Sequence, residues 1–509
     1  MGTRYVIKVD LADVWAAPDR KELLRTLAWG DEIVVNNITP TALEIEVVVY
    51  VQQQGGSVIT QKTTGFIVPR KSQKLRPSDL VAEPASNDVL RVNFVDVQQG
   101  DGAVIESPDG KVILVDGGDN QLFARYLAGR FNGTTAAKPK DIDCILVTHG
   151  DADHFAGLVE IFDSETLGDV KKQLFIRPHR VFHNGIVKRP STRNDKRVPD
   201  RELLGATKQV AGSTYITGLE ENLLEVDDAQ MNQPFRRWKA ALAHYDQRQK
   251  IAFRRLQLGD NEAFDFFNDG AMRIEVLGPI PAEVDGKPAL KFLGEPPEGP
   301  RIGHESLEDT ALRSSGLSAS HTINGHSVVF KLGYGGFSYL FCGDLNDESS
   351  RFLARENNKG TINLRSEVFK VPHHGSADFS GAFLQAVSPI ASVVSSGDEN
   401  VRKEYIHPRA TLVGALGKYS RVPEPLVFVT ELVAFFTYEG SVVPTSPARA
   451  KERGTFQGFS RAAFGMVKTR TNGSRLLIYT DSANAKLKEA YAYELDASGQ
   501  PLPAPVKRV

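Results

Sequence analysis

The densest group of chemically capable side chains lies between Asp141 and Leu158, in the sequence DIDCILVTHGDADHFAGL. An apolar, β-branched run ends at Thr148, and four potential metal ligands follow within six residues: His149, Asp151, Asp153 and His154. A buried strand that enters a polar loop presents side chains at its carboxyl end, where α/β proteins usually build their sites. Imidazole and carboxylate ligands both suit Zn, Mn or Fe. The alternative is a solvated turn, but two His framing two Asp match a turn poorly, so the stretch predicts a metal site.

Three later segments repeat this arrangement of an apolar strand followed by a ligand. Asp344 follows the predicted strand Ser338–Cys342, and His373 and His374 follow Glu367–Val371. His407 comes after a polar turn. Any one of them alone would more often be structural. Because the carboxyl ends of strands in one sheet meet at the same rim, four such loops predict one shared site.

Several segments also resemble a known family. THGDADH is similar to the HxHxDH signature of the metallo-β-lactamase fold, with Asp151 in place of the middle His. The chain resembles the soluble hydrolase domain of competence DNA-uptake (ComEC) family proteins in FVDVQQGDGAVIESPDGKVILVDGG, HGDADHFAGL, NGHSVVFKL, LFCGDLNDES, VFKVPHHGSADFSGAFLQAVSP and YIHP. The resemblance covers about residues 90–480. It implies an α/β fold, the metallo-β-lactamase αββα sandwich.

The resemblance also implies a ligand set for two divalent metal ions, Zn or Mn. His149 and Asp151 would hold one ion, and Asp153 and His154 would hold the second. Asp344 would bridge the two ions, and His374 or His373 would be the last ligand of the second site. Asp116 would orient the metal loop. Asp151 adds an oxygen ligand, which shifts the preference slightly from Zn towards Mn. His326, near the position of the fold's third motif, is a weaker candidate ligand.

The expected chemistry follows from the charge of the two ions. Two cations about 3.5–4 Å apart acidify a bridging water to hydroxide and neutralise charge on the substrate oxygens. Asp153 or Asp344 could take the proton, and His373 or His407 could protonate or stabilise the leaving group. His407 has two further interpretations, as a metal ligand or as the cap of a helix. We expect Asp153, His373 and His407 to be the catalytic residues.

Composition and length limit the class of protein. A chain of 509 residues predicts two to four domains, and its formal charge of −2 argues against a generally basic nucleic-acid coat. No secretory signal and no membrane-length apolar run is apparent in the sequence. Cys144 and Cys342 each lie in an apolar run, which fits buried free thiols in a reducing compartment. We therefore expect a cytoplasmic protein with no membrane association.

The chain divides into four predicted parts. Residues 1–75 contain short strand patterns, and ADVWAAPDRKELLRTLAWGDEIVV resembles bacterial SH3-like β-barrels. Residues 76–89 are predicted to be a linker, and residues 90–480 the hydrolase domain. Residues 481–509 are predicted to be a C-terminal extension that ends in a loose, Pro-rich tail from Leu495.

Residues from about 168 to 264 are predicted to be a mainly helical insertion, with a helix over Pro234–Leu256. The insertion is rich in Lys and Arg, which suits either a solvated surface or a face that follows a phosphate backbone. We weigh the two interpretations equally.

Three functions remain open at this stage. The first is a two-metal phosphodiesterase or nuclease that acts on DNA through a metal-bound hydroxide. The second is a hydrolase of a small phosphodiester, lactone or thioester, because a fold does not fix a substrate. The third is a partner-regulated effector that docks a protein through the N-terminal barrel.

Overall fold

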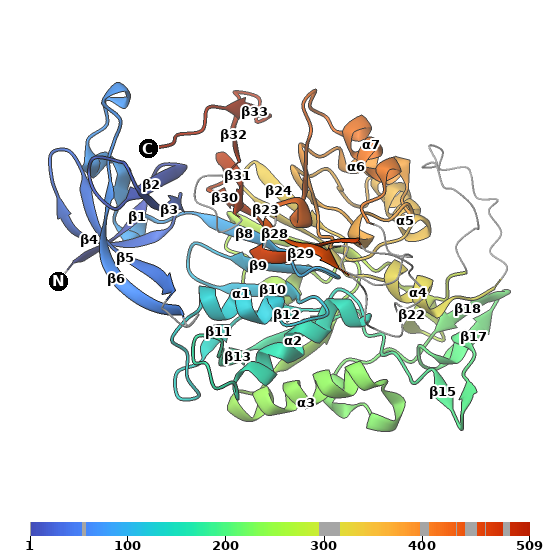
Figure 1. The fold of residues 1–509 in the computed structure, drawn as a ribbon. Coiled ribbons are helices and arrows are strands. Elements are labelled where there is room, and N and C mark those ends of the chain that lie inside the picture. The colour runs from blue at the N-terminus through green and yellow to red at the C-terminus, as the bar shows by residue number, and fades with distance from the viewer. Residues whose placement is uncertain are drawn as a thin grey trace. The chain divides into compact units, whose positions relative to one another are not determined.

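The computed structural model describes residues 2–52, 58–294, 316–397, 407–433, 435–442, 456–463, 465–481 and 489–509 (Figure 1). Tyr405 and Ile406 of the predicted His-Pro loop lie outside these residues. The chain forms two compact units, one of Met1–Val92, Ser107–Gly110 and Lys468–Val509, the other of Asn93–Glu106 and Lys111–Val467. The boundary between them falls within β8 (Leu90–Val95) and β30 (Met466–Thr471).

The first unit contains a seven-stranded antiparallel sheet in the order β3-β2-β6-β5-β4-β1-β7. Its strands are β1 (Thr3–Ile7), β2 (Leu11–Trp15), β3 (Leu23–Ala28), β4 (Glu32–Ile38), β5 (Leu43–Gln52), β6 (Val58–Ile67) and β7 (Val81–Ala82). This part of the chain therefore contains an antiparallel sheet, and the predicted domain bounds, the SH3-like character and a docking role stay predictions.

Two segments expected to be irregular belong to this unit's ordered structure. Leu80 and Val81, in the predicted linker, are buried in the core of the sheet, and β7 pairs with β1. The C-terminal part forms β31 (Arg475–Asp481), β32 (Ala490–Leu495) and β33 (Pro501–Ala504). Val509 is 1 % exposed and its N–H donates to the Leu11 carbonyl at 2.9 Å. The predictions of a linker and of a loose tail were therefore wrong.

The second unit contains two sheets with helices against them. The first sheet includes the strands β9 (Gly102–Glu106), β10 (Val112–Asp116), β12 (Cys144–Leu146), β14 (Arg180–His183) and β19 (Ala252–Arg255), neighbours in that order. Helices α1 (Leu122–Arg130), α2 (Ala152–Ser164) and α3 (Gln233–Arg248) share its hydrophobic core. In α3 the buried residues Phe235, Trp238, Leu242 and Tyr245 recur with helical spacing, which puts one apolar face on this core.

The second sheet has the order β20-β23-β24-β25-β26-β27. Its strands are β20 (Met272–Gly278), β23 (Val329–Tyr334), β24 (Phe337–Phe341), β25 (Val368–Lys370), β26 (Ala391–Val394) and β27 (Leu426–Val429). Its core cluster includes residues of α5 (Asp347–Asn358), α6 (Gly381–Val387) and α7 (Ala410–Tyr419). The strands β24 to β27 are parallel, so their carboxyl ends lie at one rim.

Aromatic side chains fill the space between the two sheets. Phe94 and Phe341 stack with ring centroids 5.7 Å apart, and Phe330 stacks on Phe341 at 4.6 Å. Phe182 of β14 meets Phe264 edge to face at 5.3 Å. Two sheets packed through these rings, with helices α1–α3 and α5–α7 in the outer cores, are consistent with the predicted αββα sandwich.

The predicted insertion is not mainly helical. Residues 168–264 contain one α-helix, α3, which ends at Arg248 rather than Leu256, and seven strands. Besides β14 and β19 these are β13 (Ile176–Pro178), β15 (Thr192–Arg193), β16 (Lys196–Arg197), β17 (Thr207–Val210) and β18 (Ser213–Ile216). Since β14 and β19 extend the first sheet, the segment is part of the sandwich itself.

The remaining elements are short or peripheral. They are β11 (Lys140–Ile142), β21 (Ala282–Val284), β22 (Lys287–Lys291), α4 (Ala319–Gly325), α8 (Thr430–Val433), β28 (Phe435–Val442) and β29 (Phe456–Ala463). Cys144 and Cys342 are buried free thiols, as predicted. Within the described part of the chain, no helix has the length and apolar character needed to cross a bilayer.

Candidate metal centre

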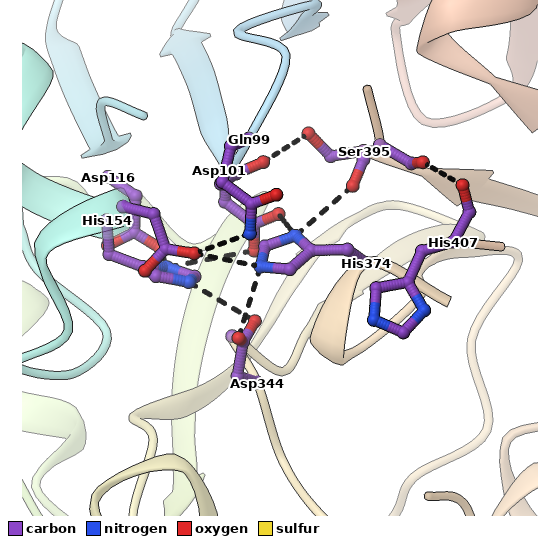
Figure 2. A network of polar contacts seen from close by, with 12 residues as sticks. Gln99, Asp101, Asp116, His154, Asp344, His374, Ser395 and His407 are labelled. Atoms are coloured by element: carbon purple, nitrogen blue, oxygen red, sulfur yellow. Dashed lines mark hydrogen bonds and ion pairs between the residues drawn. The ribbon is translucent and has the colours of Figure 1, made fainter. Parts of the chain in front are cut away.

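The candidate ligands converge at the carboxyl ends of strands from both sheets. His149 follows β12, and Asp153 and His154 lie in the first turn of α2. Asp344 follows β24, and His374 follows β25. Figure 2 shows His154 and His374 approaching Asp344 from different segments of the chain. The expectation that separate loops meet at one rim is therefore borne out for these residues.

The facing atoms form a tight group of nitrogen and oxygen ligands. His154 Nε2 lies 3.2 Å from Asp344 Oδ1, and His374 Nε2 lies 3.2 Å from Asp344 Oδ2. His374 Nε2 is also 3.6 Å from Asp153 Oδ2. His154 Nε2, His374 Nε2 and Asp344 Oδ1 are buried and lack a hydrogen-bond partner among the described residues. Buried polar atoms rarely stay unpaired, so their convergence fits a divalent cation with imidazole and carboxylate ligands.

The imidazole of His154 is oriented from behind. Its Nδ1 lies 2.9 Å from Asp116 Oδ2, and the hydroxyl of Thr148 donates to the same carboxylate oxygen at 2.7 Å. The Thr148 N–H donates to the other oxygen, also at 2.7 Å. A carboxylate behind a metal-binding His fixes the tautomer and the ring orientation. Asp116 therefore occupies the orienting position expected from the sequence.

Electrostatics within the group favour binding of a positive charge. Burial opposes ionisation of Asp344, but the neighbouring His374 and His154 hold its pKa well below the usual range. Burial also opposes charge on His154, while Asp344 and Asp116 raise the pKa of its imidazole well above the usual range. Protons on the imidazoles thus balance the negative charge of the carboxylates. A metal ion would displace these protons on binding.

His149 lies on one side of this group. Its ring centroid is 4.0 Å from that of His154, and its nearest ligand set is His154 with Asp344. Burial and the charge on His154 lower the pKa of His149 well below its ordinary value. The neutral ring therefore offers a lone pair to a cation.

Asp151 is placed differently from the other predicted ligands. Its Oδ1 accepts from Lys188 Nζ at 2.6 Å, and the side-chain amide group of Asn324 lies 3.0 Å from its Oδ2. Four ligand groups occur among the described residues: His149, His154 and Asp344; Asp153, His154 and His374; Asp101, Asp116 and His154; and Asp101, Asp344 and His374. Asp151 is in none of them.

Two buried residues behind His374 were missed by the sequence analysis. Asp101 forms an ion pair with Lys370, and its Oδ1 lies 3.4 Å from His374 Nδ1. The available signal was Lys370, a charged residue within the apolar run Val368–Val371, because a buried Lys requires a partner. His374 Nδ1 makes its hydrogen-bond contact with the Ser395 carbonyl at 3.2 Å, and the Asp101 carboxylate supplies a negative charge beside it.

The turn before Asp101 packs closely against the loop that contains Asp153. Gly100 has a φ of +101°, and a Cβ there would lie 1.7 Å from the Asp153 carbonyl oxygen, so only glycine fits. Gln99 Nε2 donates to Asp153 Oδ2 at 2.9 Å. The Ser395 hydroxyl, after β26, donates to the Gly100 carbonyl at 2.9 Å (Figure 2). This turn therefore fixes the carboxylate of Asp153.

The three remaining predicted histidines differ in placement. His373 and His374 both have positive φ, 50° and 51°, a strained arrangement that is common at functional sites. The rings of His373 and His407 are 6.0 Å apart, at the edge of the ligand group. His326 lies away from it, because its Nε2 contacts the Lys291 carbonyl at 2.7 Å. His374 rather than His373 thus faces the other ligands.

Comparisons with known proteins agree with this geometry over part of the chain. Residues 95–211 match the model of the Metallo-beta-lactamase superfamily. Over 98 residues, 19 % of the chain, it is 32 % identical to ComE operon protein 3 of Bacillus subtilis (strain 168), covering 12 % of that protein. Over 86 residues, 17 % of the chain, it is 42 % identical to Competence protein ComA of Neisseria gonorrhoeae, again covering 12 %.

The matched superfamily segment contains the strand β10, the loop from His149 to His154 and the helix α2. The chain spans about an eighth of the length of these two relatives. Over that shared part, the predicted similarity to the ComEC family is confirmed. Residues 95–211 are therefore similar to the metallo-beta-lactamase superfamily, and buried side chains that could hold a metal ion gather at the rim beside them.

Proposed function

We propose that the protein is a metal-dependent phosphodiesterase that cleaves DNA. The observation that carries this proposal is the convergence of the buried, unpaired atoms of His154, Asp344 and His374. A bound Zn or Mn ion would lower the pKa of a water molecule and draw charge from a substrate oxygen. Hydrolysis by that water breaks one P–O ester bond, and the leaving oxygen takes up a proton.

Some residues of the chain would hold the metal ion, and others would transfer protons. We assign Asp153, His154, Asp344 and His374 as ion-binding residues, with His149 beside them. Asp116 positions the His154 imidazole, and Asp101 supplies a negative charge beside His374. Gln99 engages only Asp153 Oδ2, so Oδ1 is the atom that we assign to accept a proton from the attacking water.

His373 and His407 lie where the leaving group would depart. Burial, together with the nearby His373 and His374, lowers the pKa of His407 to about 4, so its ring is neutral at pH 7. A neutral imidazole can donate a hydrogen bond to a substrate oxygen but carries no positive charge. We therefore assign the proton donor role to His373 and a phosphate-contacting role to His407.

Within residues 168–264, the distribution of positive charge supports a polymer substrate at one hairpin rather than along α3. Most basic residues of α3 and its surroundings are paired with acids: Arg237 with Asp163, Lys239 with Asp228, Arg248 with Glu165, Lys250 with Asp246, Arg254 with Glu262 and Arg255 with Glu221. These charges are already compensated, which favours the solvated-surface interpretation for the helix.

The hairpin β15–β16 is different. Residues 188–201 contain six basic and two acidic residues. The side chains of Arg193 and Arg197 are 64 % and 87 % exposed, and each makes one long ion pair of 3.7 Å, with Glu202 and Asp200 respectively. The base of the hairpin is fixed, because Val198 is buried and Asp200 Oδ2 accepts from the Ala319 N–H at 2.8 Å. Exposed cations on an anchored arm suit a phosphate backbone.

A cleavage assay on single- and double-stranded DNA and RNA tests the proposal, with Zn or Mn and with a chelator. We expect DNA cleavage that the chelator abolishes. Cleavage of a small chromogenic phosphodiester without any cleavage of DNA would instead support the small-substrate alternative. Absence of cleavage of every nucleic acid with either metal would contradict the proposal.

A further inference from the structure

The family resemblance implies two cation positions, the first of them held by His149 and Asp151. In the structure, Asp151 already has other partners. Asp151 Oδ1 accepts from Lys188 Nζ at 2.6 Å, and the side-chain amide group of Asn324 lies 3.0 Å from Oδ2, to which its NH2 donates once the amide is turned. A carboxylate that accepts a charge-assisted hydrogen bond from an ammonium group has its negative charge largely neutralised, which weakens it as a metal ligand. Lys188 thus places one positive charge where a metal ion would otherwise bind Asp151.

The other ligands can serve two positions only if the set is divided between them. His154 belongs both to the group with His149 and to the group with His374, but its Nδ1 faces Asp116, which leaves only Nε2 for a cation. One imidazole nitrogen binds one ion. If His154 joins His149 and one oxygen of Asp344, Asp153 and His374 keep the other oxygen, so each position has three protein ligands. If His154 instead joins Asp153, Asp344 and His374, that position has four protein ligands, and the first position retains only His149 and a shared oxygen of Asp344. Two ligands are too few for the tetrahedral or octahedral sites that Zn and Mn form.

We propose that this chain holds a single tightly bound divalent ion, and that the ammonium group of Lys188 acts as the second positive charge of the site. The ion occupies the position formed by Asp153, His154, Asp344 and His374. The first position then has a permanent cation that is part of the protein. The catalytic part of this proposal rests on the proposed phosphodiesterase function, whereas the number of bound ions does not.

The placement of Lys188 suits contact with a substrate oxygen. Its carbonyl accepts from the N–H of Asn232, the residue that caps α3, so its backbone is tied to the helix. Its side chain is 30 % exposed, so the ammonium group can be reached from solvent. An ammonium has three N–H donors, and among the described residues Asp151 is its acceptor through one of them. The others can meet a phosphoryl oxygen.

The helix α3 also packs on the metal loop, which ties the Lys188 segment to it. A Cβ at Gly150, between His149 and Asp151, would lie 2.7 Å from the ring of Phe235. Phe235 is in the first turn of α3, directly after the Asn232 cap. The loop and Lys188 are thus held by one helix, so their separation is set by the fold rather than by the side chains alone.

Metal stoichiometry tests the proposal without reference to activity. The whole protein is stripped with a chelator, loaded with excess Mn²⁺, desalted and measured by elemental analysis and by electron paramagnetic resonance. We expect about one ion per chain in the wild type and the spectrum of isolated Mn²⁺. In Lys188→Met the freed Asp151 completes a second position, so we expect a second, weaker ion and a signal from coupled Mn²⁺ pairs.

The matched control is Lys196→Met, which removes the same charge from the exposed hairpin and should keep one ion. Asp151→Asn should also retain the single ion, because Asp151 is not among its ligands. Thermal unfolding of each variant confirms that it folds. Two ions in the wild type, no second ion in folded Lys188→Met, or loss of the ion in Asp151→Asn would each contradict the proposal. Loss of DNA cleavage with the predicted ion count would instead contradict the proposed function alone.

Discussion

His154 Nδ1 lies 2.9 Å from Asp116 Oδ2, so only the Nε2 atom of this imidazole faces Asp344 and the other ligands. This contact sets which nitrogen carries the proton and which can bind a cation. Replacing Asp116 by Asn keeps the shape but removes the negative charge and exchanges one of the two acceptor oxygens for an NH2 group. We expect Asp116→Asn to weaken metal binding by about 10–100-fold, measured by competition with a metallochromic chelator.

The control for that experiment is Asp163→Asn. It removes the same charge from the surface of α2, where Asp163 pairs with Arg237, and should leave metal affinity unchanged. Equal affinities of Asp116→Asn and the wild type would contradict the orienting role.

The buried ion pair of Lys370 with Asp101 predicts a large loss of stability. Lys370 is 4 % exposed and Asp101 is 5 % exposed. Removing one partner of such a pair leaves an uncompensated buried charge, which costs about 3–5 kcal/mol. We expect Lys370→Met to lose this much free energy of unfolding in urea, and the double variant with Asp101→Asn to recover part of it. A loss of free energy of unfolding below about 1 kcal/mol is typical of an exposed ion pair and would contradict a buried one.

The buried ring of His183 predicts a pH dependence of stability. Its Nδ1 accepts from the Gly185 N–H at 3.0 Å and its Nε2 lies 3.3 Å from the Glu221 carbonyl, so both nitrogens are satisfied in the neutral ring. Burial lowers the pKa of His183 from 6.5 to about 4. Between pH 4 and pH 6.5 the His183 ring is protonated in the unfolded chain and neutral in the folded chain. Its contribution to the free energy of unfolding is therefore complete above pH 6.5 and is lost as the pH falls towards 4.

The measurement is the free energy of unfolding at pH 7 and pH 5 for the wild type and for His183→Gln. The other titrating groups are shared and cancel in the comparison. We expect the wild type to lose roughly 2 kcal/mol more than the variant on acidification. Parallel losses in the two proteins would show that His183 is not the responsible group.

The β15–β16 hairpin predicts how affinity for DNA depends on salt. Substituting Arg193, Lys196 and Arg197 by Gln should raise KM for DNA and reduce the slope of log affinity against log salt by about two to three. Hydrolysis of a small chromogenic phosphodiester should not change, because the hairpin does not reach into the ligand group.

Arg237, Lys239 and Lys250 on α3 provide the matched triple control, since each is already paired with a carboxylate. We expect their Gln variants to keep the salt slope of the wild type. A larger effect from α3 than from the hairpin would reverse this assignment of the DNA-binding surface.

The sequence was sufficient to predict the convergence of ligands, because parallel strands place their carboxyl ends at one rim. His154, Asp344 and His374 each follow an apolar run, so their meeting required no knowledge of side-chain packing. The same reasoning cannot find Lys188, because nothing in its local sequence indicates Asp151 as its partner. That contact depends on how residues 168–264 pack onto the first sheet.

The errors in the fold have similar causes. Helical periodicity continued from α3 towards Leu256, but residues 252–255 form an edge strand because β14 offers them a backbone to pair with. The prolines of the C-terminal segment suggested a loose tail. Pro501 and Pro503 lie in β33, the last strand of its sheet, where a missing N–H donor is tolerated.

The most direct test of the central claim combines metal analysis with a DNA cleavage assay on the same preparation of wild type and Asp344→Ala. Asp344 faces both His154 and His374, so its loss should release the bound ion and abolish cleavage, while Asp285→Ala, at an exposed carboxylate, should retain both. The account predicts a wild-type protein that holds Zn or Mn and cleaves DNA only with it. A folded Asp344→Ala variant that keeps its ion and its activity would contradict it.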